Sequence, residues 1–142
     1  MMAGNTVTIL LVEDDPVDVE AIHRALRKVK VANPLFVASD GLEALEMLRG
    51  SSGKGPIPRP YLILLDLNMP RMNGLELLKV IRADEALSRS IIFILTTSKH
   101  DEDRVAAYGL NVAGYVVKSN VADGFISLFN MLDHYWRIVE FP

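Results

Sequence analysis

The chain of 142 residues contains no cysteine. This absence excludes a disulfide framework and thiolate metal sites, and it fits a reducing compartment, so we expect a cytoplasmic protein. Long apolar runs are absent too: the first run, Val7 to Val12, is far too short to cross a membrane, and the acids Glu13-Asp14-Asp15 follow it. We therefore expect neither a signal peptide nor a membrane anchor.

A concentration of positive charge is also missing. The formal net charge is -3, and the lysines and arginines are interspersed with acids. A protein that tracks a phosphodiester backbone usually carries a basic stripe or patch. We therefore expect no direct nucleic-acid partner.

Hydrophobic residues make up 50% of the chain, which is enough for one domain with a real core. Five short apolar runs alternate with amphipathic stretches. This alternation is typical of βα units that form a parallel sheet covered by helices on both faces. The five runs are Val7 to Val12, Leu35 to Ala38, Tyr61 to Leu65, Ile91 to Thr96 and Gly114 to Val117.

Capping signals place the helices between these runs. Asp15-Pro16 is an N-cap followed by a proline at the first helical position, and Asp40 with Glu43 resembles a capping box. The expected helices run from Asp15 to about Lys30, from Asp40 to Gly50, from about Gly74, from about Asp101 to Tyr108, and from about Val121 to Val139. The segment from Gly50 to Pro60 is rich in Gly, Ser and Pro, which predicts a surface loop.

Reactive side chains follow four of the apolar runs. In an open α/β sheet, ligands bind beyond the carboxyl ends of the strands. The segments at those ends are Glu13-Asp14-Asp15, Asp66-Leu67-Asn68, Thr96-Thr97-Ser98 and Lys118. Acids from neighbouring strands repel each other unless a cation joins them, and an all-oxygen site suits Mg²⁺. The pattern predicts a magnesium site.

A carboxylate beside Mg²⁺ can act as a nucleophile and form an aspartyl phosphate. Asp66 is the candidate acceptor, and Lys118 and Thr96 are placed to contact the phosphoryl oxygens. Each residue alone also has an ordinary structural interpretation, as a helix cap, a solvated lysine at a strand end, or a threonine favoured in strands. The hypothesis depends on their occurring together, in this order, at one end of successive strands.

At these residues the chain resembles the receiver domain of bacterial two-component response regulators. Four segments carry the resemblance: ILLVEDD, LLDLNMPRMNGLELL, FILTTS and GYVVK. The resemblance covers nearly the whole chain, and the second segment is highly specific. The resemblance implies a flavodoxin-like (βα)5 fold, a doubly wound parallel sheet in the order 2-1-3-4-5. It implies one receiver domain over residues 1–142, without an output domain.

The resemblance also assigns roles by position. It implies that Asp66 is the phosphoacceptor and that Lys118 is the lysine of the family pattern. The metal ligands that it implies are Glu13, Asp14, Asp66 and the backbone carbonyl of Asn68. Thr96 resembles the switch hydroxyl, with Thr97 as the alternative one residue on, and Tyr115 resembles the aromatic that changes rotamer with the switch.

By the same resemblance, a sensor histidine kinase or a histidine phosphotransfer domain donates the phosphoryl group. The chain is then a signalling domain and not an enzyme, apart from its own phosphorylation and slow dephosphorylation. The long loop before the third strand and the aromatic C-terminal segment resemble regulators paired with phytochrome-type kinases. Met131 and Ile138 extend the last apolar stripe and Phe141 lies past its end, so these residues either cover the edge of the domain or form a partner surface. In the family, the face made by the fourth helix, fifth strand and fifth helix is commonly the dimer or output surface, and the resemblance therefore implies a homodimer through that face.

One segment departs from the family pattern: Ser119-Asn120 follows Lys118 where the family usually has proline. A cis peptide bond before a non-proline residue costs about 2.5–4 kcal/mol, so this turn differs from the usual one or is strained. A pseudo-receiver that binds partners without phosphorylation is therefore an alternative. An aspartate-nucleophile phosphatase is a second, although such enzymes generally need an acid where this chain has Asn68.

Overall fold

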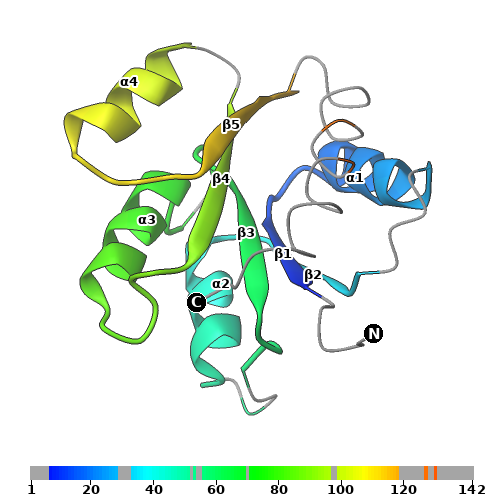
Figure 1. The fold of residues 1–142 in the computed structure, drawn as a ribbon, viewed down its shortest axis with the longest axis horizontal. Coiled ribbons are helices and arrows are strands. Elements are labelled where there is room, and N and C mark those ends of the chain that lie inside the picture. Colours follow the sequence, from blue (N-terminus) through cyan, green and yellow to red (C-terminus); the bar gives the residue numbers. More distant parts are fainter. Residues whose placement is uncertain are drawn as a thin grey trace.

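A computed structural model describes residues 7–28, 33–51, 53, 56–69, 71–96, 99–118, 127 and 130. The strands are β1 (Thr8–Val12), β2 (Leu35–Ala38), β3 (Tyr61–Asp66), β4 (Ile91–Thr96) and β5 (Gly114–Val117). All neighbours pair in parallel, in the order β2-β1-β3-β4-β5 (Figure 1). Both the positions of the strands and their order confirm the expectation from the sequence.

The described helices are α1 (Pro16–Lys28), α2 (Gly41–Arg49), α3 (Gly74–Ala83) and α4 (Lys99–Ala107). The expected fifth helix, 121–139, falls almost entirely outside the described residues. None of the helices in the described part of the chain is long and apolar enough to cross a membrane.

Capping explains where the helices begin. The Asp15 carboxylate accepts a hydrogen bond from the Val17 N–H at 2.9 Å, so the predicted N-cap of α1 is confirmed. Asp40 accepts one from the Glu43 N–H at 2.9 Å and caps α2. The Glu43 side chain accepts from the Ser39 N–H instead of closing the box on Asp40. Asp40 is therefore a cap, but the expected reciprocal box is not formed there.

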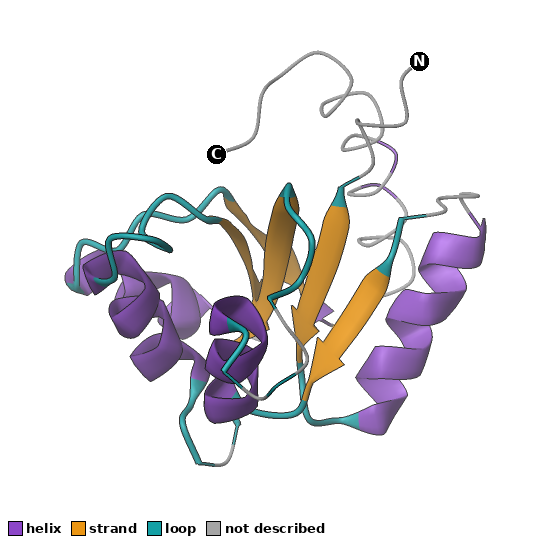
Figure 2. Ribbon diagram, turned by 90° about the horizontal axis from the view of Figure 1, so that it is seen from below, coloured by secondary structure: helices purple, strands orange, loops and turns teal. Residues whose placement is uncertain are grey.

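Alternate strand residues pack on opposite faces of the sheet. Leu10 and Val12 of β1 belong to the core cluster that includes residues of α2 and α3, together with Val105 of α4. Ile9 and Leu11 belong to the cluster that includes residues of α1. The sheet therefore lies between α1 on one side and the other described helices on the opposite side (Figure 2). This arrangement confirms the expectation of helices on both faces.

The loop between α2 and β3 is less peripheral than its composition predicts. Gly50 has a φ of 72° and ends α2 in the left-handed conformation that glycine favours. Ile57, however, is buried in the core, and its N–H donates to the Met47 carbonyl at 3.1 Å. The prediction of a surface loop was therefore wrong for Ile57, whose apolar side chain anchors the loop despite its Gly- and Pro-rich surroundings.

Candidate functional site

Three carboxylates meet at the carboxyl ends of β1 and β3. Glu13 and Asp14 directly follow β1, and Asp66 is the last residue of β3. These strands are neighbours, with Val12 paired to Leu65. One ligand oxygen from each acid lies within 4.8 Å of the other two. Glu13 and Asp66 are buried, whereas Asp14 is exposed, so the cluster opens to solvent on one side.

The ammonium of Lys118 lies against this cluster. Lys118 directly follows β5, and its Nζ is 2.7 Å from Glu13 Oε2 and 3.3 Å from Asp66 Oδ2. Its third neighbour is Asp18 of α1, at 3.0 Å. The lysine side chain is only 15% exposed, so these ion pairs are shielded from bulk water. The long side chain of Lys118 thus links the end of β5 to β1, β3 and α1.

Burial of several like charges raises the proton affinity of the acids. The pKa of Glu13 is raised to about 7, chiefly by desolvation and also by the charge of Asp66, although Lys118 and the Asp15 N–H act in the opposite direction. Desolvation likewise raises the pKa of Asp66 against the opposing charge of Lys118. Burial tends to lower the pKa of Lys118, but bonds to Glu13 and Asp18 outweigh it and raise that pKa. Burial therefore disfavours the ionised forms of both acids, and the contact with Lys118 offsets only part of this effect.

The loop that follows Asp66 is held close to it. The Asn68 N–H donates to Asp66 Oδ1 at 3.3 Å, and the Gly74 N–H donates to the Leu67 carbonyl at 3.0 Å. Any side chain at Gly74 would overlap the Asp66 carbonyl oxygen and the Leu67 Cα. A glycine is therefore required where α3 begins, because the backbone of the acceptor strand passes directly beside it.

The far end of this loop is attached to α2. Arg71, with a φ of 58°, pairs through Nε with Asp40 Oδ2 at 2.6 Å, and the Gly41 N–H donates to the Met72 carbonyl at 2.9 Å. The Arg71 hydrogen bond lowers the pKa of the buried Asp40, which keeps it ionised. Asp40 thus caps α2 and fixes the loop that carries Asn68.

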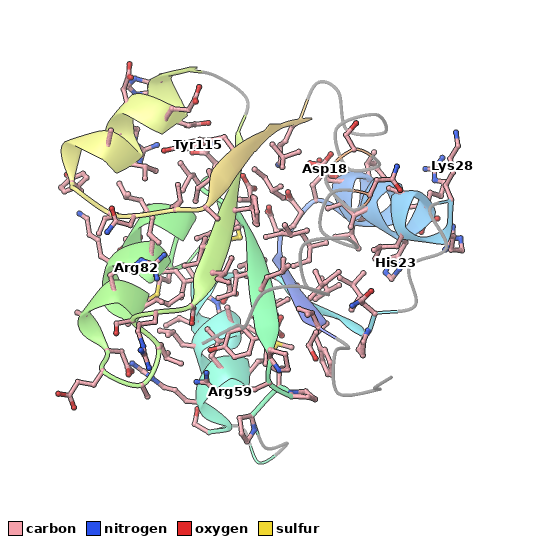
Figure 3. The ribbon with its side chains drawn as sticks, in the orientation of Figure 1. Asp18, His23, Lys28, Arg59, Arg82 and Tyr115 are labelled. Carbon is pink, nitrogen blue, oxygen red and sulfur yellow. The ribbon has the colours of Figure 1, made fainter. Side chains whose placement is uncertain are left out.

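The two predicted switch residues lie on β4 and β5. Thr96 ends β4 and pairs with Val117, so its backbone stands beside the end of β5. Its side chain and Thr97 lie outside the described residues, and the choice between the two hydroxyls stays a prediction. Tyr115 pairs with Ile94 and packs against the core on the side of α2, α3 and α4 (Figure 3). Burial and then the nearby acids of α4 raise the pKa of Tyr115.

Several predicted features of the site and of the dimer surface fall in segments that the structure does not describe. The turn Ser119-Asn120 and the residues Met131, Ile138 and Phe141 lie outside the described residues.

Asp18 belongs to the site although the sequence did not predict it there. It lies in the first turn of α1, four residues after Asp14, on the side of the helix that faces the sheet (Figure 3). Acids are common in the first turn of a helix, where they interact favourably with the helix dipole. The sequence therefore offers no reason to assign Asp18 a contact with Lys118.

The donor set fits a hard divalent cation. Its three acids offer only oxygen ligands, which suit Mg²⁺ or Mn²⁺ and not a thiophilic metal. Burial raises the pKa of both Glu13 and Asp66, so a cation bound between them would favour their ionised forms. The structure thus contains an acidic pocket of the composition that a divalent cation needs.

Comparison with known proteins identifies the family. The sequence model described as "Response regulator receiver domain" matches residues 9–129. Response regulator Rcp1 of Synechocystis sp. is 34% identical over 128 residues, which cover 90% of this chain and 87% of Rcp1. Its Mn²⁺-bound crystal structure has a TM-score of 0.77 and 34% identity, covering 96% of this chain and 99% of that one.

Two further solved structures are similar over almost their whole length. The bacteriophytochrome response regulator AtBRR is 36% identical, with a TM-score of 0.79 and coverage of 95% of this chain and 98% of that chain. The phosphorylated cyanobacterial phytochrome response regulator RcpA is 33% identical, with a TM-score of 0.80 and coverage of 96% and 99%. With five parallel strands in the order 2-1-3-4-5 and an acidic pocket at their carboxyl ends, the chain belongs to the receiver domain family of two-component response regulators.

Proposed function

We propose that Asp66 accepts a phosphoryl group and that this modification switches the protein in a phosphorelay. The observation that carries the proposal is the position of the Asp66 carboxylate. It is buried at the end of β3, 3.3 Å from the Lys118 ammonium, and shares a pocket with Glu13 and Asp14. A nucleophilic carboxylate, a fixed positive charge and a cation site are the components of phosphoryl transfer to aspartate.

In the proposed reaction, a carboxylate oxygen of Asp66 forms a bond to phosphorus while the bond from phosphorus to the donor nitrogen breaks. The imidazole of the donor histidine leaves with that electron pair and takes up a proton. Lys118 donates hydrogen bonds to the oxygens of the transferring group, and its charge offsets the negative charge there. The Asn68 N–H, 3.3 Å from Asp66 Oδ1, helps to orient the acceptor.

Glu13, Asp14, Asp66 and the Asn68 carbonyl would hold Mg²⁺ in this site. When bound, the cation neutralises charge that develops on the phosphoryl oxygens. Glu13, Asp14 and Asp66 supply their ligand oxygens from within 4.8 Å of one another. The Mn²⁺-bound form of Rcp1, a similar protein, supports a divalent cation in this chain.

The donor that we propose is a sensor histidine kinase or a histidine phosphotransfer domain, of the type that works with phytochromes. The support for this subgroup is that AtBRR and RcpA are described as phytochrome-type response regulators. The net charge of -3 without a basic stripe supports a protein partner and not nucleic acid.

The two rival interpretations are less well supported. Aspartate-nucleophile phosphatases generally use an acid two residues after the nucleophile, and here that residue is Asn68. A pseudo-receiver would have no need of a buried acceptor in contact with a lysine, yet Asp66 and Lys118 are in contact.

The new phosphoryl group would change the preferred positions of the Thr96 and Tyr115 side chains, which lie on β4 and β5. The surface formed by α4 and β5 would change with them.

Phosphoryl uptake in solution tests the proposal. Incubation of the whole chain with a small phosphoryl donor and Mg²⁺ should add one phosphoryl group per chain, measured by intact-mass spectrometry. Removal of Mg²⁺ with a chelator should reduce the uptake to background, because Lys118 is then the one positive charge, among the described residues, in contact with the acids around the incoming anion. If the chain gains no mass with Mg²⁺ present, the pseudo-receiver is the correct interpretation.

We further propose that the protein forms a homodimer through α4, β5 and the segment 121–139, for which the sequence predicts a helix. The support on the described residues is Tyr108, a large aromatic side chain directly after α4 that is 57% exposed. Sedimentation should show a dimer at high concentration and a larger dimer fraction with a phosphoryl mimic bound. A monomer under both conditions would remove the dimer from the proposal but leave phosphoryl acceptance untouched.

A further inference from the structure

We infer that Asp18 is a positioning residue that holds the Lys118 ammonium beside Asp66. The inference rests on the proposed function, since it concerns the same phosphoryl-accepting site. Asp18 is on α1, whereas the three acids of the cation pocket come from the ends of β1 and β3. It therefore approaches Lys118 from a separate element of the fold.

The geometry matches each donor of the ammonium to one carboxylate. An ammonium has three N–H donors. The oxygens around Nζ are Glu13 Oε2 at 2.7 Å, Asp18 Oδ2 at 3.0 Å and Asp66 Oδ2 at 3.3 Å. Asp66 is the most distant of the three even though Asp18 is also bound. At 3.3 Å, Asp66 is still within ion-pair distance, so Asp18 binds the ammonium while leaving it within reach of the acceptor.

Asp18 differs from the other two partners in what cation binding does to it. Glu13 and Asp66 belong to the group of acids that can hold a cation, and Asp18 does not. A bound cation compensates the charge of Glu13 and Asp66 and repels the ammonium. Only Asp18 then retains its full negative charge toward Lys118. Without it, the lysine would be repelled from the pocket in the metal-bound state, when phosphoryl transfer takes place.

The backbone around Asp18 suits this role. Lysine carries its charge on a flexible four-carbon side chain, so its position must be set by its partners. Asp18 has a short side chain in the first turn of α1, which the Asp15 cap and Pro16 hold at a defined starting point. Its side chain is 21% exposed. A rigid, largely shielded anion is thus placed against a flexible cation.

Chemical labelling tests the inference without phosphorylation. The whole chain with saturating Mg²⁺ is treated with a limiting amount of an amine-acylating reagent, and modification of Lys118 is measured by peptide mass spectrometry. Asp18→Ala should raise Lys118 labelling about tenfold, the effect expected for one shielded ion pair. Asp18→Asn should have a smaller effect, because its amide oxygen still accepts a hydrogen bond. Equal labelling in wild type and Asp18→Ala would overturn the inference.

Two controls separate positioning from a general loss of structure. Labelling of Lys79, on α3, should not change in any variant. Glu20→Ala removes an acid from the same helix, but Glu20 pairs with Arg24 and Arg27 at the surface. It should leave Lys118 labelling at the wild-type level. A rise in labelling at both lysines in Asp18→Ala would indicate unfolding and would count against a positioning role.

Phosphorylation kinetics provide the second readout. At saturating Mg²⁺, Asp18→Ala should lower the maximal rate of phosphoryl uptake about tenfold, with the half-saturating donor concentration unchanged. In a Lys118→Met background the same substitution should have no further effect, because Asp18 acts through Lys118. A faster rate, or an equal loss in both backgrounds, would overturn the inference. Failure of the wild type to take up phosphate would refute the proposed function alone, because labelling still tests Asp18.

Discussion

The Asp66→Asn chain should take up no phosphoryl group from a small donor with Mg²⁺, whereas the wild type takes up one. An amide oxygen is a far weaker nucleophile than a carboxylate, and it cannot form an acyl phosphate. The substitution keeps the shape of the side chain and preserves an oxygen that can accept from the Asn68 N–H. Intact-mass spectrometry should show full loss of the phosphorylated species.

Asp15→Asn is the matched control for this prediction. Asp15 follows β1, directly after Glu13 and Asp14 of the acidic cluster. Its carboxylate instead caps α1 through the Val17 N–H, and asparagine caps helices equally well. This variant should therefore retain phosphoryl uptake. The wild-type modification should also be released by hydroxylamine, as an acyl phosphate is and a phosphoserine is not. A mass gain that persists in Asp66→Asn would mean that another residue accepts the group.

Much of the fold could be predicted from local signals in the sequence. Apolar runs bounded by turn residues located all five strands, and the end of β4 was located to the residue. The Asp15-Pro16 pair marked the start of α1 because both capping and the fixed φ of proline act within a few residues. The capping box of α3 was missed although the Asn73 and Glu76 needed for it are present in the sequence.

Contacts between distant segments were harder to predict. Ile57 is a single apolar residue in a polar segment, and nothing adjacent to it shows that it reaches the core. Arg71 pairs with Asp40, which lies 31 positions earlier in the chain, so no periodicity connects them. Strand order brings such residues together, and the register of the sheet determines which side chains meet. Glu13, Asp14 and Asp66 could be predicted as a group because all three lie at the carboxyl ends of two neighbouring strands, β1 and β3.

The electrostatics of the site suggest why it is built with surplus acid. Three carboxylates contact the single ammonium of Lys118, those of Glu13, Asp18 and Asp66, and a fourth, Asp14, lies beside Glu13 and Asp66. Such an arrangement destabilises the metal-free fold but increases the attraction for a divalent cation. The pocket therefore exchanges folding stability for metal affinity. That exchange can be measured separately from phosphorylation.

Neutralising Glu13 should stabilise the metal-free protein at high pH. The pKa of Glu13 is raised from its ordinary 4.5 to about 7 in the folded chain, chiefly by burial. A raised pKa in an acid means that the folded state holds the proton more tightly than the unfolded state does. Stability from this group is therefore full below pH 4.5 and is lost as the pH rises toward 7, at a cost of about 3 kcal/mol.

Glu13→Gln carries no proton to lose, so its free energy of unfolding relative to the wild type should increase by about 2–3 kcal/mol between pH 4.5 and 8. Urea unfolding at several pH values, with a chelator present, measures this difference. The pH slope is the decisive quantity, because the contacts of the glutamine amide with Lys118 and the Asp15 N–H are the same at every pH. A difference that stays constant across this range would show that burial does not raise the pKa of Glu13.

Mg²⁺ should cancel most of the stability advantage that Glu13→Gln has at high pH. A ligand that binds only the folded state stabilises it by about 2.7 kcal/mol at one hundred times its dissociation constant. The wild type should gain this amount, and Glu13→Gln should gain much less because it has lost one anionic ligand of the cluster. Glu20→Gln, a neutralisation at a surface ion pair of α1, should stay within about 0.5 kcal/mol of the wild type at every pH, with and without Mg²⁺. Equal Mg²⁺ stabilisation of the wild type and Glu13→Gln would remove Glu13 from the metal site.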